Sequence, residues 1–550
     1  MPQQAERLAV NLPPLRHSGE IRPAWGRRAA GVPCRCRRWP IWVVLCSLFW
    51  HGAAVARSAG AEPGRVKNII LFVTDDQSPD AGCYGNPTVR TPHLDALAAE
   101  GVLFRQAFCT TASCSASRSV ILSGLHNHAN GQYGHQHAYH KFSSYPWVQT
   151  LPVMLARMGY RTARIGKHHN APEEVYFFQY KLPGNARSPV EMANNCEAFL
   201  QADDSQPFFL FFATADPHRS GETVDDAELA ANRFGNKAHE ATYPGVTEAT
   251  YDPRDVVVPD FLPDSPASRA EIAQYYQSIS RIDQGLGRLV EILKARGKWE
   301  NTLFVYTSDH GMAFPGAKTT VYEGGLRVPL VVRNPFDAAR GHENSAMISF
   351  VDLAPTLLDF AGAWDPTTQT VREAALRDAA PSDRDARPAA SRPAAGSPAD
   401  PPRPYRLHGR SLLSIMNQRQ PAGWDVIYAS HTFHEITMYY PMRVVRDRRY
   451  KLIWNIAHPL AFPFASDLWV ASTWQAQYRQ GLDAPYGRCS VGEYIHRPAF
   501  EFYDLVTDPH ETRNLASDPR FAQQLAEYKQ QLKQFQKASD DPWILKWDYE

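Results

Sequence analysis

The sequence predicts an α/β fold, a large mixed or parallel sheet sandwiched by helices, with a smaller α+β subdomain after it. Three apolar runs predict buried strands over residues 68–74, 207–213 and 302–307, and each is followed by polar residues that include an aspartate. Runs that are apolar throughout are typical of strands buried on both faces of a parallel sheet. Ligand sites in α/β folds lie beyond the carboxyl ends of such strands, so we expect the polar clusters to meet at one site.

Helical patterns lie between the predicted strands. A Thr-Pro pair opens residues 91–101, a Ser-Pro pair opens residues 265–297, and both segments close on glycine. Proline in the first helical turn and glycine after the last turn are the usual signs of helix ends. Strands that alternate with helices support the α/β class.

The domain organisation follows from a change in composition. Residues 63–364 contain the predicted catalytic domain. Residues 365–404 are rich in Ala, Pro, Arg and Asp without apolar periodicity, and cannot bury enough surface to offset their ordering entropy, so they predict a flexible insert. Short strand patterns and a helical pattern follow over 426–429, 442–445, 450–454 and 521–535, and predict a C-terminal subdomain over residues 405–550.

Residues 1–56 are predicted to be an export leader. They combine an Arg-rich stretch with an apolar run over residues 39–50 and small residues at 54–56. The apolar run is shorter than the ~20 residues that span a bilayer, which predicts no stable membrane insertion after cleavage, with an uncleaved anchor as the alternative. We expect export, to the periplasm or the exterior in a bacterium and to the lysosome in an animal.

The body of the chain is slightly acidic. The whole sequence has 58 basic and 57 acidic residues, but eight arginines and two glutamates lie in the leader, which leaves 50 basic against 55 acidic residues. A nucleic-acid-binding protein normally carries a basic surplus on its folded part, so we expect no nucleic-acid partner.

One segment carries a candidate nucleophile. In Cys-Ser-Ala-Ser-Arg, residues 114–118, a helix that begins at Cys114 would place Arg118 one turn later on the same face. The amino end of a helix favours anions, so a thiol and a cation would meet where an oxyanion could bind. Five cysteines lie beyond the leader, and this odd number leaves at least one unpaired. The alternative is a buried structural cysteine.

This segment resembles the signature of the sulfatases, Cys-x-Pro-x-Arg, in which the cysteine is oxidised to formylglycine. Ala116 stands where the signature usually has Pro. The resemblance covers roughly residues 65–535, implies the alkaline-phosphatase-like form of the α/β fold, and implies a formylglycine-generating or radical maturation enzyme as a partner. Further motifs follow in the family's order: Asp75-Asp76, Gly166-Lys167-x-His169, Asp216-Pro217-His218, Asp309-His310-Gly311 and Glu323-Gly324-Gly325.

The resemblance also implies one Ca²⁺ per chain, with Asp75, Asp76, Cys114, Asp309 and His310 as ligands. Carboxylates are hard ligands that suit Ca²⁺. Imidazole is softer, so chemistry alone leaves Mn²⁺ and Zn²⁺ open, whereas the family combines Asn or His at this position with Ca²⁺. The structural alternative is that such aspartates cap helices or form turns.

The catalytic roles come from the resemblance as well. Sulfate esters and sulfamates resist hydrolysis because anionic oxygens screen the sulfur, so cations must surround the sulfuryl group. The hydrate of a formylglycine derived from Cys114 would be the nucleophile. The alternative for each other residue is a solvated charge or a structural hydrogen bond. The implied roles are Arg118 and Lys167 to stabilise the nucleophile, His169 to orient it or act as base, and His218 with Lys318 to bind the sulfuryl oxygens and assist the leaving group.

A dense histidine run over residues 126–140 predicts either a zinc site or a polar loop beside the active site. Residues 130–137 and 434–443 resemble the branch of sulfatases that removes N-sulfate from glucosamine in heparan-type glycans. That branch implies a sulfated amino sugar or glycosaminoglycan as substrate, with Glu435 placed to pair with a developing ammonium. The implied substrate contacts are Arg219, His135, His137, His434, Glu435 and Arg443.

The sequence leaves three alternatives to the removal of N-sulfate from glucosamine open. An O-sulfatase acting on a sulfated sugar, and a phosphoester or phosphonate hydrolase of the same superfamily, would use related chemistry. A carbohydrate-binding protein in which Cys114 is never converted belongs to another class. A homodimer also stays open.

Overall fold

The computed structural model describes residues 66–202, 205–219, 234–237, 242–376 and 404–548. The leader predicted over residues 1–56 lies outside these ranges. Within them, no helix combines the length and the apolar character that crossing a membrane requires.

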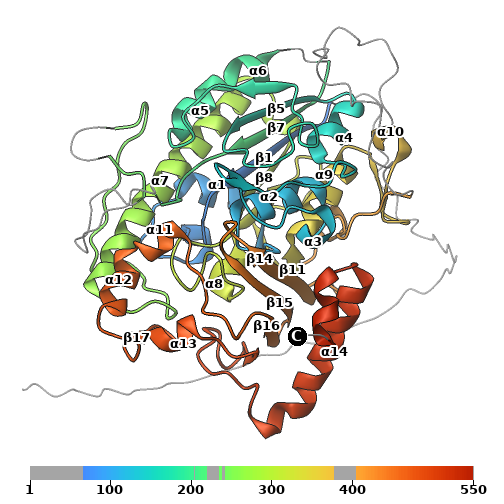
Figure 1. The fold of residues 1–550 in the computed structure, drawn as a ribbon. Coiled ribbons are helices and arrows are strands. Elements are labelled where there is room, and N and C mark those ends of the chain that lie inside the picture. Colours follow the sequence, from blue (N-terminus) through green and yellow to red (C-terminus); the bar gives the residue numbers. More distant parts are fainter. Residues whose placement is uncertain (1–65, 203–204, 220–233, 238–241, 377–403, 549–550) are drawn as a thin grey trace, which may run out of the picture. The chain divides into compact units, whose positions relative to one another are not determined.

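A nine-stranded mixed sheet forms the centre of the fold (Figure 1). Strands β8, β1, β7, β5 and β6 run parallel in that order, and β10, β2 and β11 continue the sheet beyond β8. β10 is antiparallel to both of its neighbours, and β9 pairs with β2. The three strands predicted from apolar runs are confirmed as the adjacent strands β1, β7 and β8. The strands are β1 (Asn68–Thr74), β2 (Val102–Phe108), β5 (Arg161–Gly166), β6 (Tyr180–Leu182), β7 (Phe208–Ala213), β8 (Thr302–Ser308), β9 (Arg327–Val328), β10 (Leu330–Arg333) and β11 (His342–Ser349).

Side-chain alternation along β1 divides the core into two layers. Ile69, Leu71 and Val73 belong to one hydrophobic cluster, whereas Ile70 and Phe72 belong to another. Successive residues of a strand point to opposite faces, so these clusters lie on the two faces of the sheet. Helices α2, α4 and α9 contribute to the first cluster, α1 and α5 contribute to the second, and the long helix α7 contributes to both. The helices are α1 (Pro92–Glu100), α2 (Cys114–Ser123), α4 (Leu151–Arg157), α5 (Pro189–Asn195), α7 (Pro266–Ala295) and α9 (Leu353–Phe360).

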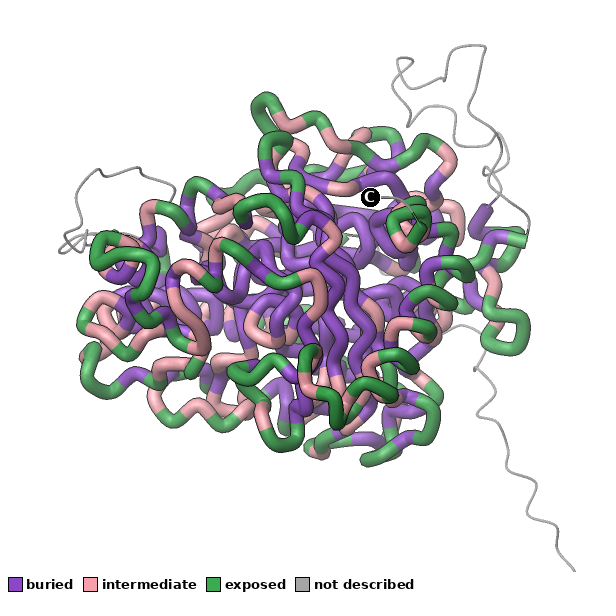
Figure 2. The backbone as a smooth tube through the Cα atoms, turned by 60° about the horizontal axis from the view of Figure 1, so that its bottom comes forward, coloured by how far each residue is buried: buried purple, intermediate pink, exposed green. Residues whose placement is uncertain are grey.

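Buried residues follow the strands through the centre of the molecule, and exposed residues lie mainly in the loops and outer helices (Figure 2). The two predicted helices are confirmed as α1 and α7. Helix α7 begins as its sequence predicts, because the Ser265 side chain accepts a hydrogen bond from the backbone N–H of Ser268 and Pro266 occupies the first turn.

A second, antiparallel sheet lies in the C-terminal part of the chain. Its strand order is β14 (Val426–Phe433), β15 (Tyr439–Asp447), β16 (Tyr450–Asn455) and β19 (Phe500–Asp504). Helix α14 (Ala522–Ala538) packs on it through Tyr528 and Leu532, which share a core with Val445, Leu452 and Phe502. These elements account for the strand and helix patterns that return after the predicted insert.

The first part of the predicted insert, residues 365–376, contains short structured elements. β12 (Trp364–Asp365) pairs with β13 (Thr370–Val371), and α10 (Glu373–Leu376) follows them. Val371, Ala375 and Leu376 are buried in the core, so a few apolar side chains anchor a stretch whose average composition is polar. The rest of the predicted insert, except for residue 404, lies outside the described residues; this part is residues 377–403. The other short elements are α3 (Asn127–Asn130), β3 (Gln136–His137), β4 (His140–Lys141), α6 (Glu197–Gln201), α8 (Glu323–Leu326), α11 (Ser466–Trp469), α12 (Ser472–Tyr478), β17 (Pro485–Tyr486), β18 (Cys489–Ser490) and α13 (Val491–Ile495).

Candidate active site

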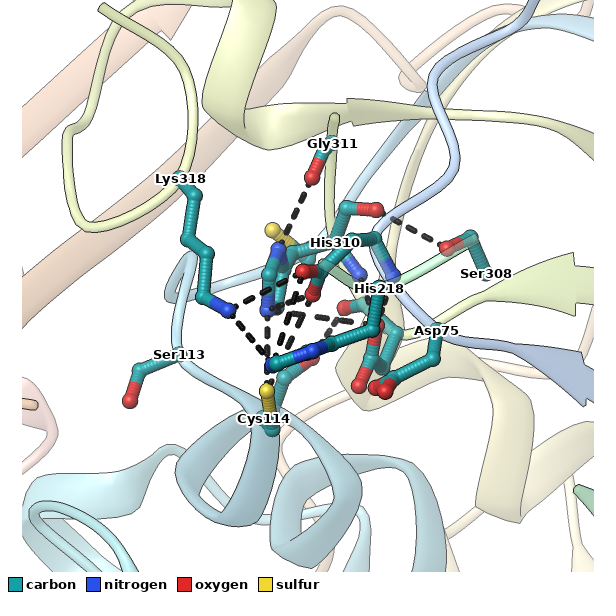
Figure 3. Close-up of polar contacts among 12 residues, drawn as sticks. Asp75, Ser113, Cys114, His218, Ser308, His310, Gly311 and Lys318 are labelled. Atoms are coloured by element: carbon teal, nitrogen blue, oxygen red, sulfur yellow. Dashed lines mark hydrogen bonds and ion pairs between the residues drawn. The ribbon is translucent and has the colours of Figure 1, made fainter. Parts of the chain in front are cut away.

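The predicted polar clusters meet where the carboxyl ends of neighbouring parallel strands face the amino end of α2 (Figure 3). Cys114 is the first residue of α2, directly after its N-cap Ser113. Arg118 lies one turn later, as its spacing predicts. The strand ends supply the remaining groups: Asp75 and Asp76 after β1, Lys167 after β5, His218 beyond β7, and Asp309 and His310 after β8.

Two cations hold the carboxylates of this site. The Arg118 guanidinium donates from Nε to Asp309 Oδ2 at 3.0 Å and from Nη2 to Asp75 Oδ1 at 2.9 Å. Lys167 Nζ lies 2.5 Å from Asp75 Oδ2. Burial alone would raise the pKa of Asp75, but the charges of Lys167 and Arg118 hold it well below its usual value. Asp75 is therefore an ionised carboxylate that is fully excluded from solvent, which requires such partners.

A compact group of possible metal ligands lies beside these pairs. One atom from each of Asp76, Cys114, Asp309 and His310 lies within 4.8 Å of the others, and all four residues are buried. Burial raises the pKa of Asp309 to about 6, although Arg118 opposes the shift. A bound cation would relieve this cost, because it favours the ionised form.

The imidazole of His310 fits a metal ion between these groups. Its Nδ1 lies 2.9 Å from the carbonyl oxygen of Gly311, an acceptor, so Nδ1 carries a proton. Its Nε2 then faces Asp76 Oδ1 at 3.0 Å and Cys114 Sγ at 3.4 Å. With Nδ1 committed to this carbonyl, Nε2 is the ring atom left to bind a metal ion. Anchoring of the far ring nitrogen by a carbonyl is also typical of metal-binding histidines.

Lys318 connects the carboxylates to His218. Its Nζ lies 3.0 Å from Asp76 Oδ2, 2.9 Å from His218 Nε2 and 2.9 Å from Asp467 Oδ2. His218 Nδ1 lies 2.5 Å from the carbonyl oxygen of Arg219. Burial, with the charge of Lys318 added, lowers the pKa of His218 to about 4, so the ring is neutral and its Nε2 accepts from the ammonium.

Asp467 was missed in the sequence. It is buried on α11, 149 residues beyond Lys318, and no recognisable motif surrounds it. Burial would raise the pKa of Asp467, but Lys318 and His218 lower it well below its usual value. Only the packing of the C-terminal segment onto the site brings this carboxylate to Lys318.

Four predicted histidines form one cluster beside Cys114. The Nε2 atoms of His135 and His434 lie 2.8 Å apart, and His137 Nδ1 lies 2.7 Å from His169 Nε2. The ring of His135 also stacks on that of His169, with centroids 4.8 Å apart. Single atoms of Cys114, His135 and His169 lie within 4.8 Å of one another, so the zinc interpretation keeps a geometric basis alongside that of a polar wall.

The structure places two predicted substrate contacts, Arg219 and Arg443, in internal ion pairs. Arg219 is buried and donates to both oxygens of Glu271, at 2.7 and 3.0 Å. Arg443 is buried and donates to both oxygens of Asp541, at 2.5 and 2.9 Å. Both guanidiniums are therefore committed to internal ion pairs. Glu435 is half-buried and makes no side-chain hydrogen bond to a described residue, so it stays a candidate.

Buried neutral histidines predict that acid destabilises the protein. Burial lowers the pKa of His128 and of His431 to about 3, below the ordinary value near 6.5 that applies in the unfolded chain. The unfolded chain binds more protons between those values, so the free energy of unfolding falls as pH falls, by about 2 kcal/mol for each residue at pH 5. Asp80 and Asp283 act oppositely, because burial raises the pKa of these carboxyls to about 6 and about 7.

We expect the histidines to dominate, because their pKa is lowered at many more of the described positions than an aspartate pKa is raised. These histidines are His126, His128, His135, His137, His168, His169, His218, His408, His431 and His434. Urea unfolding at pH 7 and pH 5 measures the difference. Equal or greater stability at pH 5 would contradict this expectation.

Comparison with known proteins places the chain in a family. Residues 67–363 match the Sulfatase family model. The chain belongs to the sulfatase family, and it is an enzyme of that class. It is 37% identical over 491 residues to human N-sulphoglucosamine sulphohydrolase, an alignment that covers 87% of this chain and 92% of the human protein. It is 27% identical over 472 residues to an ulvan-active sulfatase of Formosa agariphila, with 82% and 76% covered.

Solved structures share the fold. A protein solved in complex with its substrate D-glucosamine-2-N,6-O-disulfate has a TM-score of 0.57 at 22% identity, over 87% of this chain and 99% of that one. Phosphonate monoester hydrolase of Agrobacterium radiobacter has a TM-score of 0.58 at 19% identity, over 86% and 96%. These likenesses confirm the predicted architecture, a large mixed sheet covered by helices.

Proposed function

We propose that this enzyme hydrolyses the N-sulfate of glucosamine residues in heparan-type glycans. The observation that carries the proposal is the 37% identity to human N-sulphoglucosamine sulphohydrolase, which extends over 92% of that protein. The buried cations around Cys114 support it, because they provide the positive charge that a sulfuryl group requires.

The nucleophile in this proposal is formylglycine formed from Cys114. Burial raises the pKa of the Cys114 thiol well above its ordinary value. An unconverted thiol here is protonated and a poor nucleophile, so the position has little use as a cysteine. The hydrate of formylglycine would supply the hydroxyl that attacks sulfur.

Ca²⁺ is the proposed metal, with Asp75, Asp76, Asp309 and His310 as its protein ligands. Three carboxylates form a mostly hard donor set, which suits Ca²⁺ better than the softer transition metals. The ion would polarise a sulfuryl oxygen and the attacking hydroxyl.

The chain's own side chains perform the remaining tasks. Arg118 and Lys167 fix the ionised Asp75 and add positive charge beside Cys114. Lys318 Nζ donates to the neutral ring of His218 at Nε2, so a hydrogen-bonded proton donor already lies at the leaving-group side. His169 lies next to Cys114 and orients the nucleophile.

The sugar is proposed to lie against the wall formed by His135, His137, His434 and Glu435. The first three rings contact one another or His169, so they present a continuous surface. Export of the chain, conversion of Cys114 by a formylglycine-generating or radical enzyme, and a homodimeric state complete the proposal.

A panel of substrates tests the proposed function. It comprises N-sulfoglucosamine, glucosamine 6-O-sulfate and a phosphonate monoester, with release of sulfate or phosphonate measured at several concentrations. We expect the highest kcat/KM for N-sulfoglucosamine. A preference for the O-sulfate would identify an O-sulfatase, and turnover of the phosphonate ester alone would place the chain with the hydrolases of that branch.

A further inference from the structure

Asp467 is a buried carboxylate that the proposed reaction does not yet use. It lies on the short helix α11 of the C-terminal segment, and its Oδ2 is 2.9 Å from Lys318 Nζ and 3.9 Å from His218 Nε2. Its charge also interacts with the ring of His434. Asp467 thus lies beside the leaving-group pair.

The charges around Lys318 indicate what Asp467 does not do. Lys318 serves two carboxylates, Asp76 and Asp467. When a divalent ion is bound, Asp76 is one of its ligands, and Asp467 is then the carboxylate left to Lys318. A negative charge here works against binding of an anionic sulfuryl group, because like charges repel at short range. A role in binding sulfate therefore does not explain Asp467.

The leaving group offers an explanation. Cleavage of a sulfamate breaks the S–N bond, and its electron pair stays on nitrogen, which takes one proton from the Lys318–His218 pair. The sulfuryl group passes to the oxygen of the attacking hydroxyl as the new S–O bond forms, and His169 accepts the proton that this hydroxyl loses. The released amine takes a second proton from solvent and becomes an ammonium. An O-sulfate instead releases a neutral hydroxyl, which gains less from a neighbouring carboxylate.

We infer that Asp467 selects nitrogen as the leaving atom, by accepting a hydrogen bond from the amine as it forms and by binding the ammonium product. This inference rests on the proposed function and adds a specificity-determining residue to it. Glu435, which the sequence suggested for this role, makes no hydrogen bond to Lys318 or His218. Asp467 Oδ2, in contrast, lies 2.9 Å from Lys318 Nζ and 3.9 Å from His218 Nε2.

Product binding tests the inference without turnover. Glucosamine and inorganic sulfate are titrated separately into the matured, metal-loaded enzyme by calorimetry, as wild type, Asp467→Asn and Asp467→Glu. Asp483→Asn is the matched control, because Asp483 is an exposed aspartate of the same C-terminal segment. Thermal unfolding of each variant checks that it is folded.

We expect Asp467→Asn to weaken glucosamine binding about tenfold or more, as the loss of a charge-assisted hydrogen bond does, while sulfate binding stays equal or becomes tighter. Asp467→Glu, which keeps the charge, should lose less affinity for glucosamine, and Asp483→Asn should bind both ligands as wild type does. Unchanged glucosamine affinity in Asp467→Asn, or an equal loss for both ligands, would overturn the inference. So would a wild-type enzyme that does not bind glucosamine.

Kinetics separate this inference from the proposed function. Asp467→Asn should lower kcat/KM for N-sulfoglucosamine by a much larger factor than for p-nitrophenyl sulfate, an ester with an oxygen leaving group. Equal losses on both substrates would contradict the selective role of Asp467. If instead the wild type hydrolyses the aryl ester but not N-sulfoglucosamine, the proposed function fails.

Discussion

Replacement of Cys114 by alanine is expected to abolish sulfate release while the fold remains intact. Alanine cannot be converted to formylglycine, so the nucleophile is lost, and kcat should fall by roughly 10⁵-fold or more, as for nucleophiles of other covalent enzymes. The side chain removed is small, and α2 keeps its N-cap residue and its core contacts. Sulfate release from N-sulfoglucosamine and urea unfolding measure the two effects.

Cys109→Ala is the matched control for this substitution. Cys109 is also buried and free, but its Sγ lies 3.5 Å from the carbonyl oxygen of Gly325 and is not part of the group of possible metal ligands. We expect Cys109→Ala to retain activity at a modest cost in stability. Substantial turnover by Cys114→Ala would end the covalent proposal.

Removal of the divalent ion should eliminate activity and lower the free energy of unfolding. Without it, the buried carboxylates of Asp75, Asp76 and Asp309 lie close together, and side-chain cations and two backbone N–H groups that donate to Asp309 compensate only part of their charge. A ligand that binds only the folded state raises the free energy of unfolding by about 2.7 kcal/mol when its free concentration is about a hundred times its Kd. Chelation followed by addition of a single metal, read as activity and as melting temperature, measures both effects.

Ca²⁺ should restore activity better than Mg²⁺, because Mg²⁺ demands near-octahedral geometry and gives up its water reluctantly. Asp309→Asn should show a smaller stabilisation by Ca²⁺, whereas the exposed Asp483→Asn should respond as wild type does. Restoration by Zn²⁺ alone would contradict the assignment. It would instead favour a zinc site formed by Cys114, His135 and His169.

The centre of the fold and of the site could be predicted because both depend on local sequence patterns. Continuous apolar runs identified β1, β7 and β8, and their carboxyl ends placed Asp75 and Asp309 at one edge of the sheet. The spacing of one helical turn placed Cys114 and Arg118 on one face of α2. In such cases a short stretch of chain determines where the side chain points.

The remaining residues depend on partners that are distant in sequence. Arg219 pairs with Glu271 on α7, and Arg443 pairs with Asp541, and the sequence predicted neither ion pair. Asp467 reaches the site only because the C-terminal segment packs against it. A local sequence pattern does not predict which buried charged side chain will pair with another, because tertiary packing determines the pairing.

The mass of the Cys114-containing peptide from the active, purified enzyme tests the central claim most directly. The account predicts a peptide about 18 Da lighter than its sequence requires, because conversion of cysteine to formylglycine replaces the thiol by an aldehyde. Full activity in a preparation whose Cys114 peptide is entirely alkylated by iodoacetamide, and therefore still carries the thiol, would contradict it.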